Sequence, residues 1–459
     1  MILTTKQLRH DYEKYVGKSV KVNGWIKTIR DNKSIGFLEL TDGYFKPLQV
    51  VLIKEKLFNY DELIRQNIGA SFCVVGEIVL TPQNKQPFDL IAKSVDVLGE
   101  CATDFPLQRK QRSTLEFLRA MPSLRHRTNT FNAVFRIRSV ASFLIHQFYQ
   151  EKDFVYLNTP IITGSDCEGA GDMFQVTTLP IDKIKGEVDY SKDFFGKKAF
   201  LTVSGQLNEE CFTHGFKNTY TFGPTFRAEN SNTTRHAAEF WMMEPEMCFV
   251  DLNGLMDNEE QMLKYVINGI LNKCPDEIEF LNKFVDTELL NRLENILESQ
   301  FERLDYTKAI ELLKKENSKF NFKVEWGCDL QTEHERYLTE TLFKKPVFVT
   351  NWPREIKSFY MKQNADGKTV AAVDLLVPGV GELMGGSQRE ENLEKLLTRM
   401  KECNLQASDY QWYVNLRRYG TCVHSGFGLG FERLVMYLTG ITNIRDVCLF
   451  PRTPTTFEG

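Results

Sequence analysis

The stretch Tyr220-Thr221-Phe222-Gly223-Pro224-Thr225-Phe226-Arg227-Ala228-Glu229 decides the fold of the larger part of this chain. A polar loop follows it, and residues 236–246 then return as a second largely apolar stretch, so we expect an antiparallel hairpin. Residues two apart share a face of a strand, and Arg227 and Glu229 should therefore point the same way. A rigidly held guanidinium can bind a phosphate or a carboxylate, although a structural ion pair on a sheet would leave the same pattern.

Two further acids and an arginine lie in apolar, glycine-rich sequence. Asp374 and Glu382 are such acids, and a pair of carboxylates can share Mg²⁺ with the oxygens of a triphosphate. Arg389 follows two glycines, which leave room for a substrate near the backbone. Turn glycines beside exposed charges would give the same pattern, so these residues alone leave both interpretations open.

Alternate glycines at 426, 428 and 430 precede a helix that begins with Phe431-Glu432-Arg433. Because glycine has no side chain, a flat ligand can lie on such a backbone, and Arg433 in the first helical turn can reach a terminal phosphate. His424, by itself, is more consistent with a packed or surface histidine. The sequence contains no GxxxxGK[ST], GxSxG or HExxH motif, which excludes several familiar nucleotide-binding and hydrolytic sites.

The chain divides into three parts. Residues 1–102 predict strands at 20–25, 36–40, 48–52, 72–78 and 88–91, with a helix at 56–65 between the third and the fourth. This order is typical of an OB barrel, although other small barrels also fit. Residues 103–128 are interpreted as a hinge, and residues 129–459 as a second domain that opens with an amphipathic helix through Glu151. Within it, a charged helical insertion around 256–319 is expected to be peripheral.

Composition restricts the protein class. The 459 residues are 42% hydrophobic and 26% charged, as in globular proteins, and no apolar run approaches the ~18 residues of a membrane helix. The ten cysteines form no CxxC pair and the N-terminus lacks a secretory apolar core, which predicts a reducing cytoplasm without a zinc site or a disulfide framework. The formal net charge is −4, yet residues 106–138 contain eight Arg or Lys and one acid. This basic belt fits either a bound polyanion or a solvated charged segment.

Together these motifs carry a family resemblance. The Phe-Arg-x-Glu hairpin and the Gly-x-Gly-x-Gly-Phe-Glu-Arg helix start resemble motifs two and three of class II aminoacyl-tRNA synthetases, and the helix through Glu151 with the strand ending at Pro160 resembles motif one. The segments 164–174, 204–207, 238–242 and 386–390 resemble the asparaginyl enzymes of bacterial type, within the aspartate/asparagine/lysine branch. The resemblance covers nearly the whole chain. It implies an α+β fold with an N-terminal five-stranded OB-fold β-barrel and a catalytic domain of antiparallel β-sheet flanked by helices.

The resemblance implies a ligase that activates L-asparagine with ATP to asparaginyl-adenylate and transfers it to the 3′ end of tRNA(Asn), releasing AMP and pyrophosphate. Arg227 and Arg433 would be the catalytic residues, the first bridging the asparagine carboxylate and the α-phosphate. Mg²⁺ would accompany ATP, held by Glu382 with Asp374 as a helper. The implied ATP site comprises Arg227, Glu229, Arg235, His236, Phe240, Glu382, Gly430 and Arg433.

The implied amino-acid site comprises Glu168, Gln206, Glu229 and Arg389. Glu168 would hold the α-ammonium group and Arg389 the side-chain carbonyl. An aspartyl enzyme would carry lysine where this chain has Glu209, and the loss of a cation disfavours a carboxylate substrate. We hypothesise that Glu229 accepts a hydrogen bond from the asparagine amide and repels aspartate, because an unpaired or like-charged ligand beside a buried acceptor is strongly disfavoured.

The resemblance also implies macromolecular partners. The OB domain would bind the anticodon, with Phe37 stacking on a base and Arg30 and Gln49 making polar contacts. The basic belt would then face the tRNA backbone, and motif one would form a homodimer; no membrane or DNA partner is expected. The alternatives are an aspartyl-tRNA synthetase (including one that charges both tRNAs), a non-catalytic RNA-binding paralogue, and a free-standing asparagine synthetase, which would need no anticodon-binding domain.

Overall fold

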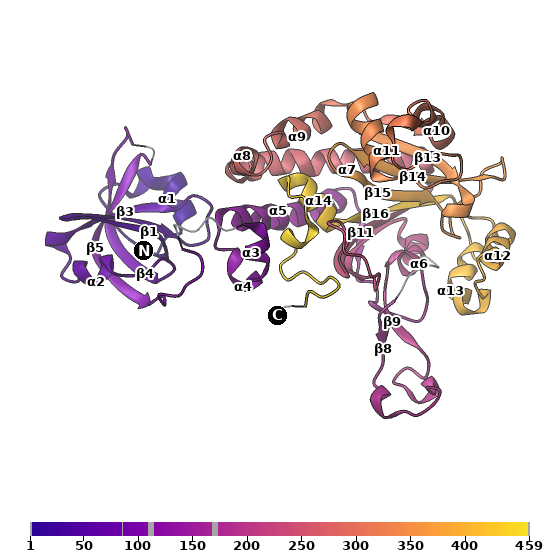
Figure 1. Ribbon diagram of the computed structural model, residues 1–459, viewed down its shortest axis with the longest axis horizontal. Coiled ribbons are helices and arrows are strands. Elements are labelled where there is room, and N and C mark those ends of the chain that lie inside the picture. Colours follow the sequence, from indigo (N-terminus) through magenta and orange to yellow (C-terminus); the bar gives the residue numbers. More distant parts are fainter. Residues whose placement is uncertain (1, 85, 109–113, 168–172, 458–459) are drawn as a thin grey trace. The chain divides into compact units, whose positions relative to one another are not determined.

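The computed structural model describes residues 2–84, 86–108, 114–167 and 173–457, which are called the described residues below (Figure 1). The chain forms two compact units, the first ending at Ala133 and the second beginning at Val134. Their boundary falls inside helix α5 (Asn129–Glu151). Among the described residues, no helix combines the length and the apolar character needed to span a membrane.

The first unit is built on five strands that close into a barrel in the order β1-β2-β3-β5-β4. The strands are β1 (Ser19–Asn32), β2 (Ile35–Thr41), β3 (Leu48–Ile53), β4 (Ser71–Leu80) and β5 (Phe88–Gly99). Helix α2 (Tyr60–Ile64) lies between the third and the fourth strands in sequence, but it is shorter than the predicted helix 56–65. Helix α1 (Thr5–Asp11) was not predicted, although its capping box of Thr4 and Gln7 is visible in the sequence.

The described part of the predicted hinge, residues 103–108 and 114–128, contains regular structure. It contains the short helices α3 (Leu115–Arg119) and α4 (Pro122–Arg125). The Arg125 side chain is fully buried, with its guanidinium 4.5 Å from the centre of the Phe131 ring. In the second unit Arg136 and Arg138 form ion pairs with Glu277 and Glu432. The basic belt is therefore not one continuous solvated surface; Arg109, Lys110 and Arg112 lie outside the described residues.

An eight-stranded sheet in the order β12-β13-β14-β15-β16-β11-β10-β6 forms the second unit. Its strands are β6 (Val155–Leu157), β10 (Asn218–Phe226), β11 (Glu239–Cys248), β12 (Glu302–Asp305), β13 (Val347–Pro353), β14 (Thr369–Val377), β15 (Gly381–Gln388) and β16 (His424–Gly430). The expected antiparallel arrangement holds from β13 to β10, whereas both edge strands, β6 and β12, pair in parallel with their neighbours. Long connections separate β6 from β10 and β12 from β13, and such connections allow parallel pairing.

Helices cover the sheet face opposite the site described below. The predicted apolar stripe of α5 is buried through Phe148. Helix α7 (Leu252–Lys273) packs on β14–β16, and it is followed by α8 (Pro275–Phe284), α9 (Leu289–Glu298) and α10 (Tyr306–Lys314). Because α7 buries Met262, Val266 and Ile270, and β12 joins the sheet edge, the segment 256–319 is integrated into this unit and is not a peripheral insertion.

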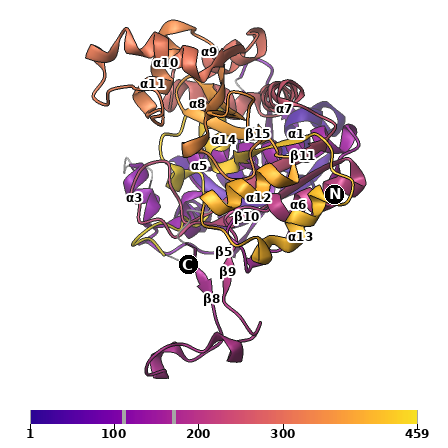
Figure 2. The same ribbon diagram turned by 90° about the vertical axis from the view of Figure 1, so that its right-hand side faces the viewer.

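The remaining elements lie around the sheet. Strands β7 (Ile162–Thr163), β8 (Gln175–Val176) and β9 (Ala199–Leu201) form a small sheet, and Figures 1 and 2 show the β8–β9 connection projecting away from the large one. Helix α6 (Gln206–Phe216) contacts β10 and β11. The others are α11 (Thr332–Arg336), α12 (Leu393–Glu402), α13 (Gln411–Val414) and α14 (Phe431–Thr439).

Candidate active site

The predicted hairpin forms, but its strands are shorter than expected. Strands β10 and β11 pair from Asn218↔Met247 to Phe226↔Glu239. Arg227 follows the last paired residue, and its backbone N–H donates to the Ala238 carbonyl (3.0 Å). The guanidinium carbon of Arg227 lies 5.5 Å from the centre of the Phe240 ring, a cation–π distance. A planar ligand group beside Phe240 would therefore lie close to the Arg227 charge.

A cavity of about 330 Å³ opens on this face of the sheet. It brings together most residues of the predicted ATP and amino-acid sites, although they come from stretches of the chain that lie far apart in the sequence. The predicted residues that line it are Gln206, Arg227, Glu229, Arg235, His236, Phe240, Asp374, Glu382, Gly430 and Arg433. Glu168 lies outside the described residues.

One side of the cavity carries converging carboxylates. Asp374 on β14 faces Gly385 of β15 in the sheet register, and a Cβ atom on Gly385 would meet oxygens of both Asp374 (3.4 Å) and Glu382 (3.3 Å). Lys357 Nζ lies 2.7 Å from Asp374, and Arg433 lies 3.4 Å from Glu382. The glycine thus leaves a gap beside two acids whose outer oxygens are held by cations.

Burial raises the pKa values of two carboxyl groups in this cluster. Burial raises the pKa of Asp374 to about 6, with Lys357 opposing the shift and Glu382 adding to it. Glu335, which was not among the predicted site residues, lies beside Glu382. Burial and the charge of Glu382 raise the pKa of Glu335 to about 7. A bound cation would relieve this mutual repulsion, because it favours the ionised carboxylates.

The loop side of the cavity carries cations. Arg235 donates to the Thr332 hydroxyl (3.2 Å), and His236 lines the cavity beside it. Burial, followed by the charge of Arg433, lowers the pKa of His236. A neutral His236 can donate a hydrogen bond to a phosphate while the charge there is supplied by the arginines.

The far end of the cavity is polar and buried. Gln206, at the start of α6, donates from Nε2 to Glu210 (3.0 Å). Glu244 on β11 is 5% exposed and accepts hydrogen bonds from the Ser204 hydroxyl and from the Gly205 N–H. Glu244 was not among the predicted site residues. Alternation along β11 would have indicated it, because Phe240, Met242 and Glu244 are each two positions apart and therefore share one face of the strand.

Glu229 does not meet the condition of a buried acceptor. Strand β10 ends at Phe226, so Glu229 lies beyond it in the loop, and its side chain is exposed. The predicted common strand face of Arg227 and Glu229 is therefore wrong, because pairing stops before either residue. Among the described residues that line the cavity, Glu244 is the buried carboxylate next to Ser204 and Gln206.

Glu209 and Arg389 also differ from expectation. Glu209 is fully buried and accepts from the Thr219 hydroxyl (2.9 Å), and it is not among the residues that line the cavity. Arg389 is 2% exposed and forms a close ion pair with Glu246, behind the cavity wall. Its guanidinium carbon lies 5.2 Å from the ring centre of Tyr360, which does line the cavity.

The predicted tRNA residues share one outer face of the barrel. Arg30 on β1 pairs with Phe37 on β2, and Glu39 pairs with Gln49 on β3. The Phe37 ring is 38% exposed, so it is not a core residue. Gln49 Nε2 donates to Asp89 Oδ1 (3.0 Å), which orients the amide on this face. An exposed aromatic ring between polar groups suits the stacking of an unpaired base.

Comparisons with known proteins point in one direction. Residues 115–454 match the family of class II tRNA synthetases (D, K and N), and residues 20–98 match the OB-fold nucleic acid binding domain. The chain is 57% identical to asparagine–tRNA ligases of Clostridium botulinum (strain Langeland) and Clostridium tetani, covering at least 99% of each chain. Among solved structures, it resembles an asparaginyl-tRNA synthetase from Pyrococcus horikoshii complexed with asparaginyl-adenylate (TM-score 0.87, 30% identity, 100% and 99% of the two chains).

Proposed function

We propose that this chain, which belongs to the asparagine–tRNA ligase family of class II aminoacyl-tRNA synthetases, activates L-asparagine with ATP and transfers it to tRNA(Asn). The observation that carries the proposal is the cavity itself. It holds a guanidinium beside an aromatic ring, a carboxylate pair and a buried polar end within one space. The guanidinium, the ring and the polar end suit the phosphate, the adenine and the amino-acid part of an aminoacyl-adenylate, and the carboxylate pair suits the metal ion that accompanies ATP.

The reaction requires no covalent bond to the enzyme. The asparagine carboxylate attacks the α-phosphorus of ATP, pyrophosphate leaves, and the tRNA terminal hydroxyl later displaces AMP. Catalysis then consists of positioning and of neutralising the charge that builds on the α-phosphate. We assign this neutralisation to Arg227 and the binding of the γ-phosphate to Arg433. Phe240 stacks on adenine, and Arg235 and His236 contact the phosphates from the loop side.

The carboxylates fit a divalent cation that accompanies ATP. Mg²⁺ takes carboxylate oxygens together with substrate phosphates, and it would neutralise the triphosphate and orient it. Glu382 would be the first residue to hold it, since Arg433 and Lys357 keep the pKa of this group below its ordinary value although burial opposes them. Asp374 would follow as the second, once its proton is lost.

Selection of asparagine over aspartate is assigned to Glu244 instead of Glu229. When ionised, Glu244 would accept a hydrogen bond from an amide N–H₂ and repel a carboxylate. Arg389 is paired tightly with Glu246, so it is less available to bind the amino acid directly. Through its contact with Tyr360, Arg389 instead helps to shape the amino-acid end of the cavity. Gln206 is the neighbouring polar contact for the amino acid.

The partner assignments rest on surface features. The outer face of the OB-fold barrel, with Phe37, Arg30 and Gln49, binds the anticodon. A homodimer would bury exposed apolar residues on the motif-one elements, of which Phe143 on α5 is 58% exposed and Tyr156 on β6 is 36% exposed. Sedimentation of the purified chain would test the dimer independently of activity.

The function is tested by ATP–pyrophosphate exchange with Mg²⁺, with asparagine and aspartate supplied in parallel. We expect exchange with asparagine alone, and Glu244→Gln should raise the aspartate signal relative to the asparagine signal. Glu229→Gln is the comparison variant: a change of the ratio there, with none on Glu244→Gln, would return the selective role to Glu229, which also lines the cavity. Exchange with aspartate alone would refute the asparagine assignment. Exchange with neither amino acid, by folded protein that binds tRNA, would favour the non-catalytic paralogue.

A further inference from the structure

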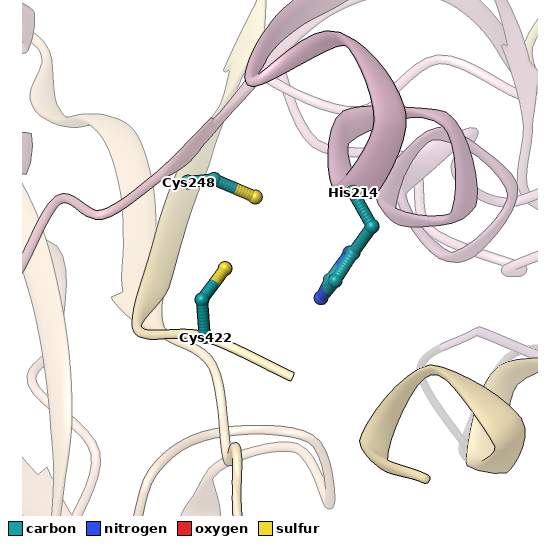
Figure 3. Close-up of side chains that lie close together, drawn as sticks. All are labelled: His214, Cys248 and Cys422. Carbon is teal, nitrogen blue, oxygen red and sulfur yellow. The ribbon is translucent and has the colours of Figure 1, made fainter. Parts of the chain in front are cut away.

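Three side chains that the proposed reaction leaves unused lie together at one end of the large sheet (Figure 3). They are His214 on α6, Cys248 at the end of β11 and Cys422 just before β16. One ligand atom of each, an imidazole nitrogen or a thiol sulfur, lies within 4.8 Å of the other two. Figure 3 shows both sulfur atoms and the ring of His214 directed into the same space.

The donor set is that of a zinc-type site. Zn²⁺ binds cysteine sulfur at about 2.3 Å and histidine nitrogen at about 2.0–2.1 Å, and a tetrahedron with these bonds separates its donors by about 3.5–3.8 Å. The three donors lie within 4.8 Å of one another, so side-chain rotations would bring them to this separation. Two thiolates would balance the charge of a divalent cation, which suits a site where Cys248 is buried and the other two residues are partly buried.

The hydrogen bonds of His214 provide a second, independent observation. Its Nδ1 lies 2.8 Å from the Glu210 carbonyl oxygen, so Nδ1 carries the proton and donates it there. Its Nε2 is buried and has no hydrogen-bond partner among the described residues. A histidine that binds a metal almost always donates its other ring N–H to a carbonyl or carboxylate, and a buried lone pair without a partner is costly. The ring is thus held with its free lone pair available to a metal.

We propose that His214, Cys248 and Cys422 bind a thiophilic divalent cation of the zinc class, with water as the fourth ligand. The site would hold α6 against the ends of β11 and β16. Cys248 pairs with His424 in the sheet register, and His424 Nε2 lies 3.0 Å from Glu210, the residue that accepts from Gln206. The cation would therefore be a structural clamp behind the amino-acid end of the cavity.

The test is cobalt binding by the reduced full-length protein, with Co²⁺ as a spectroscopic substitute for Zn²⁺. We expect about one equivalent of Co²⁺ with sulfur-to-cobalt charge-transfer absorption, which Zn²⁺ then removes. Oxygen ligands such as Asp374 and Glu382 cannot produce that absorption, so a cation bound in the active site is distinguishable. Thermal unfolding should shift to higher temperature as Zn²⁺ is added, because the folded state alone has the assembled site.

Matched variants locate the site. Cys422→Ser and His214→Asn should each weaken Co²⁺ binding by more than the 10–100-fold typical of losing an outer-shell partner. Cys403→Ser, at another partly exposed cysteine, should bind like the unaltered chain. The proposal is overturned if the unaltered reduced protein gives no charge-transfer absorption, or if Cys403→Ser loses it equally. A readily formed Cys248–Cys422 disulfide in a protein that binds no Co²⁺ when reduced would also overturn it, and would identify an oxidisable thiol pair.

Discussion

Replacing Gly426 by alanine would test how the sheet supports the amino-acid end of the cavity. Gly426 on β16 faces Glu246 on β11, and a Cβ atom there would lie 2.5 Å from the Pro245 carbonyl and closer still to the Glu246 carboxylate. Ordinary contacts of a Cβ atom begin near 3.4 Å. Since Glu246 is fully buried and paired with Arg389, the added methyl group must displace that ion pair or part the strands.

The expected cost follows from these two effects. Overpacking a core position costs about 1–3 kcal/mol, and loss of a buried ion-pair partner costs about 3–5 kcal/mol. A partial loosening of the pair therefore predicts a total of about 3–5 kcal/mol. For a unit of about 330 residues, at about 2.1 cal/mol/K per residue, the unfolding temperature of the second unit should fall by about 4–7 °C.

Gly428→Ala on the same strand is the control. Its Cβ atom would meet the flexible end of Met242 at 3.4 Å, an ordinary contact, and we expect a shift of less than about 2 °C. Scanning calorimetry of the two ligand-free variants makes the comparison. Gly426→Ala should also raise the KM for asparagine. Equal unfolding temperatures for the two variants would show that the Glu246–Arg389 pair is not held as rigidly as this reasoning requires.

Three further predictions concern the cavity and the barrel. Arg227→Ala should lower kcat for pyrophosphate exchange by about 10²–10³ with the unfolding temperature retained, since it removes one charge-stabilising group. Phe37→Ala should raise the KM for tRNA about 10-fold, the value of one stacked base, in an aminoacylation assay with pyrophosphate exchange unchanged. The pKa of Glu335 in the folded state, about 7, exceeds its ordinary value of 4.5. The stability that the protonated group contributes is therefore complete below pH 4.5 and is lost as the pH rises through 7. Glu335→Gln should unfold at a higher temperature than the unaltered chain at pH 8, and the difference should be smaller at pH 5.

Each of these predictions has a contradicting result. A tenfold or smaller effect of Arg227→Ala would remove that residue from the catalytic role. A rise in the KM for ATP on Phe37→Ala would indicate an indirect effect on the second unit. If the unfolding temperatures of Glu335→Gln and of the unaltered chain change equally between pH 5 and pH 8, Glu335 is ionised throughout this range.

Local patterns were sufficient for the elements that support the site. The alternation along residues 220–226, the helical stripe of α5 and the glycines of β16 each follow from neighbours within a few residues, and the family motifs are short segments of this kind. Helix α1 could have been found in the same way from its capping box. The residue at which a strand ends depends on pairing with another strand, and not on neighbouring residues alone. For this reason the sequence pattern wrongly extended β10 as far as Glu229.

Only the tertiary structure decided which charges meet. Arg389 and Glu246 are separated by 143 positions. Arg389 follows β15 and Glu246 lies on β11, and these two strands flank β16 in the sheet although a long stretch of chain separates them. The same holds for His214, Cys248 and Cys422, whose spacing resembles no metal motif. The sequence by itself determined the fold class, the family and the positions of the motif residues, because these depend on periodicity and short-range chemistry. Burial and pairing of side chains far apart in sequence depend on how the strands assemble, and they decided that Glu244 lines the cavity, that Glu209 and Arg389 lie behind it, and that three soft donors converge.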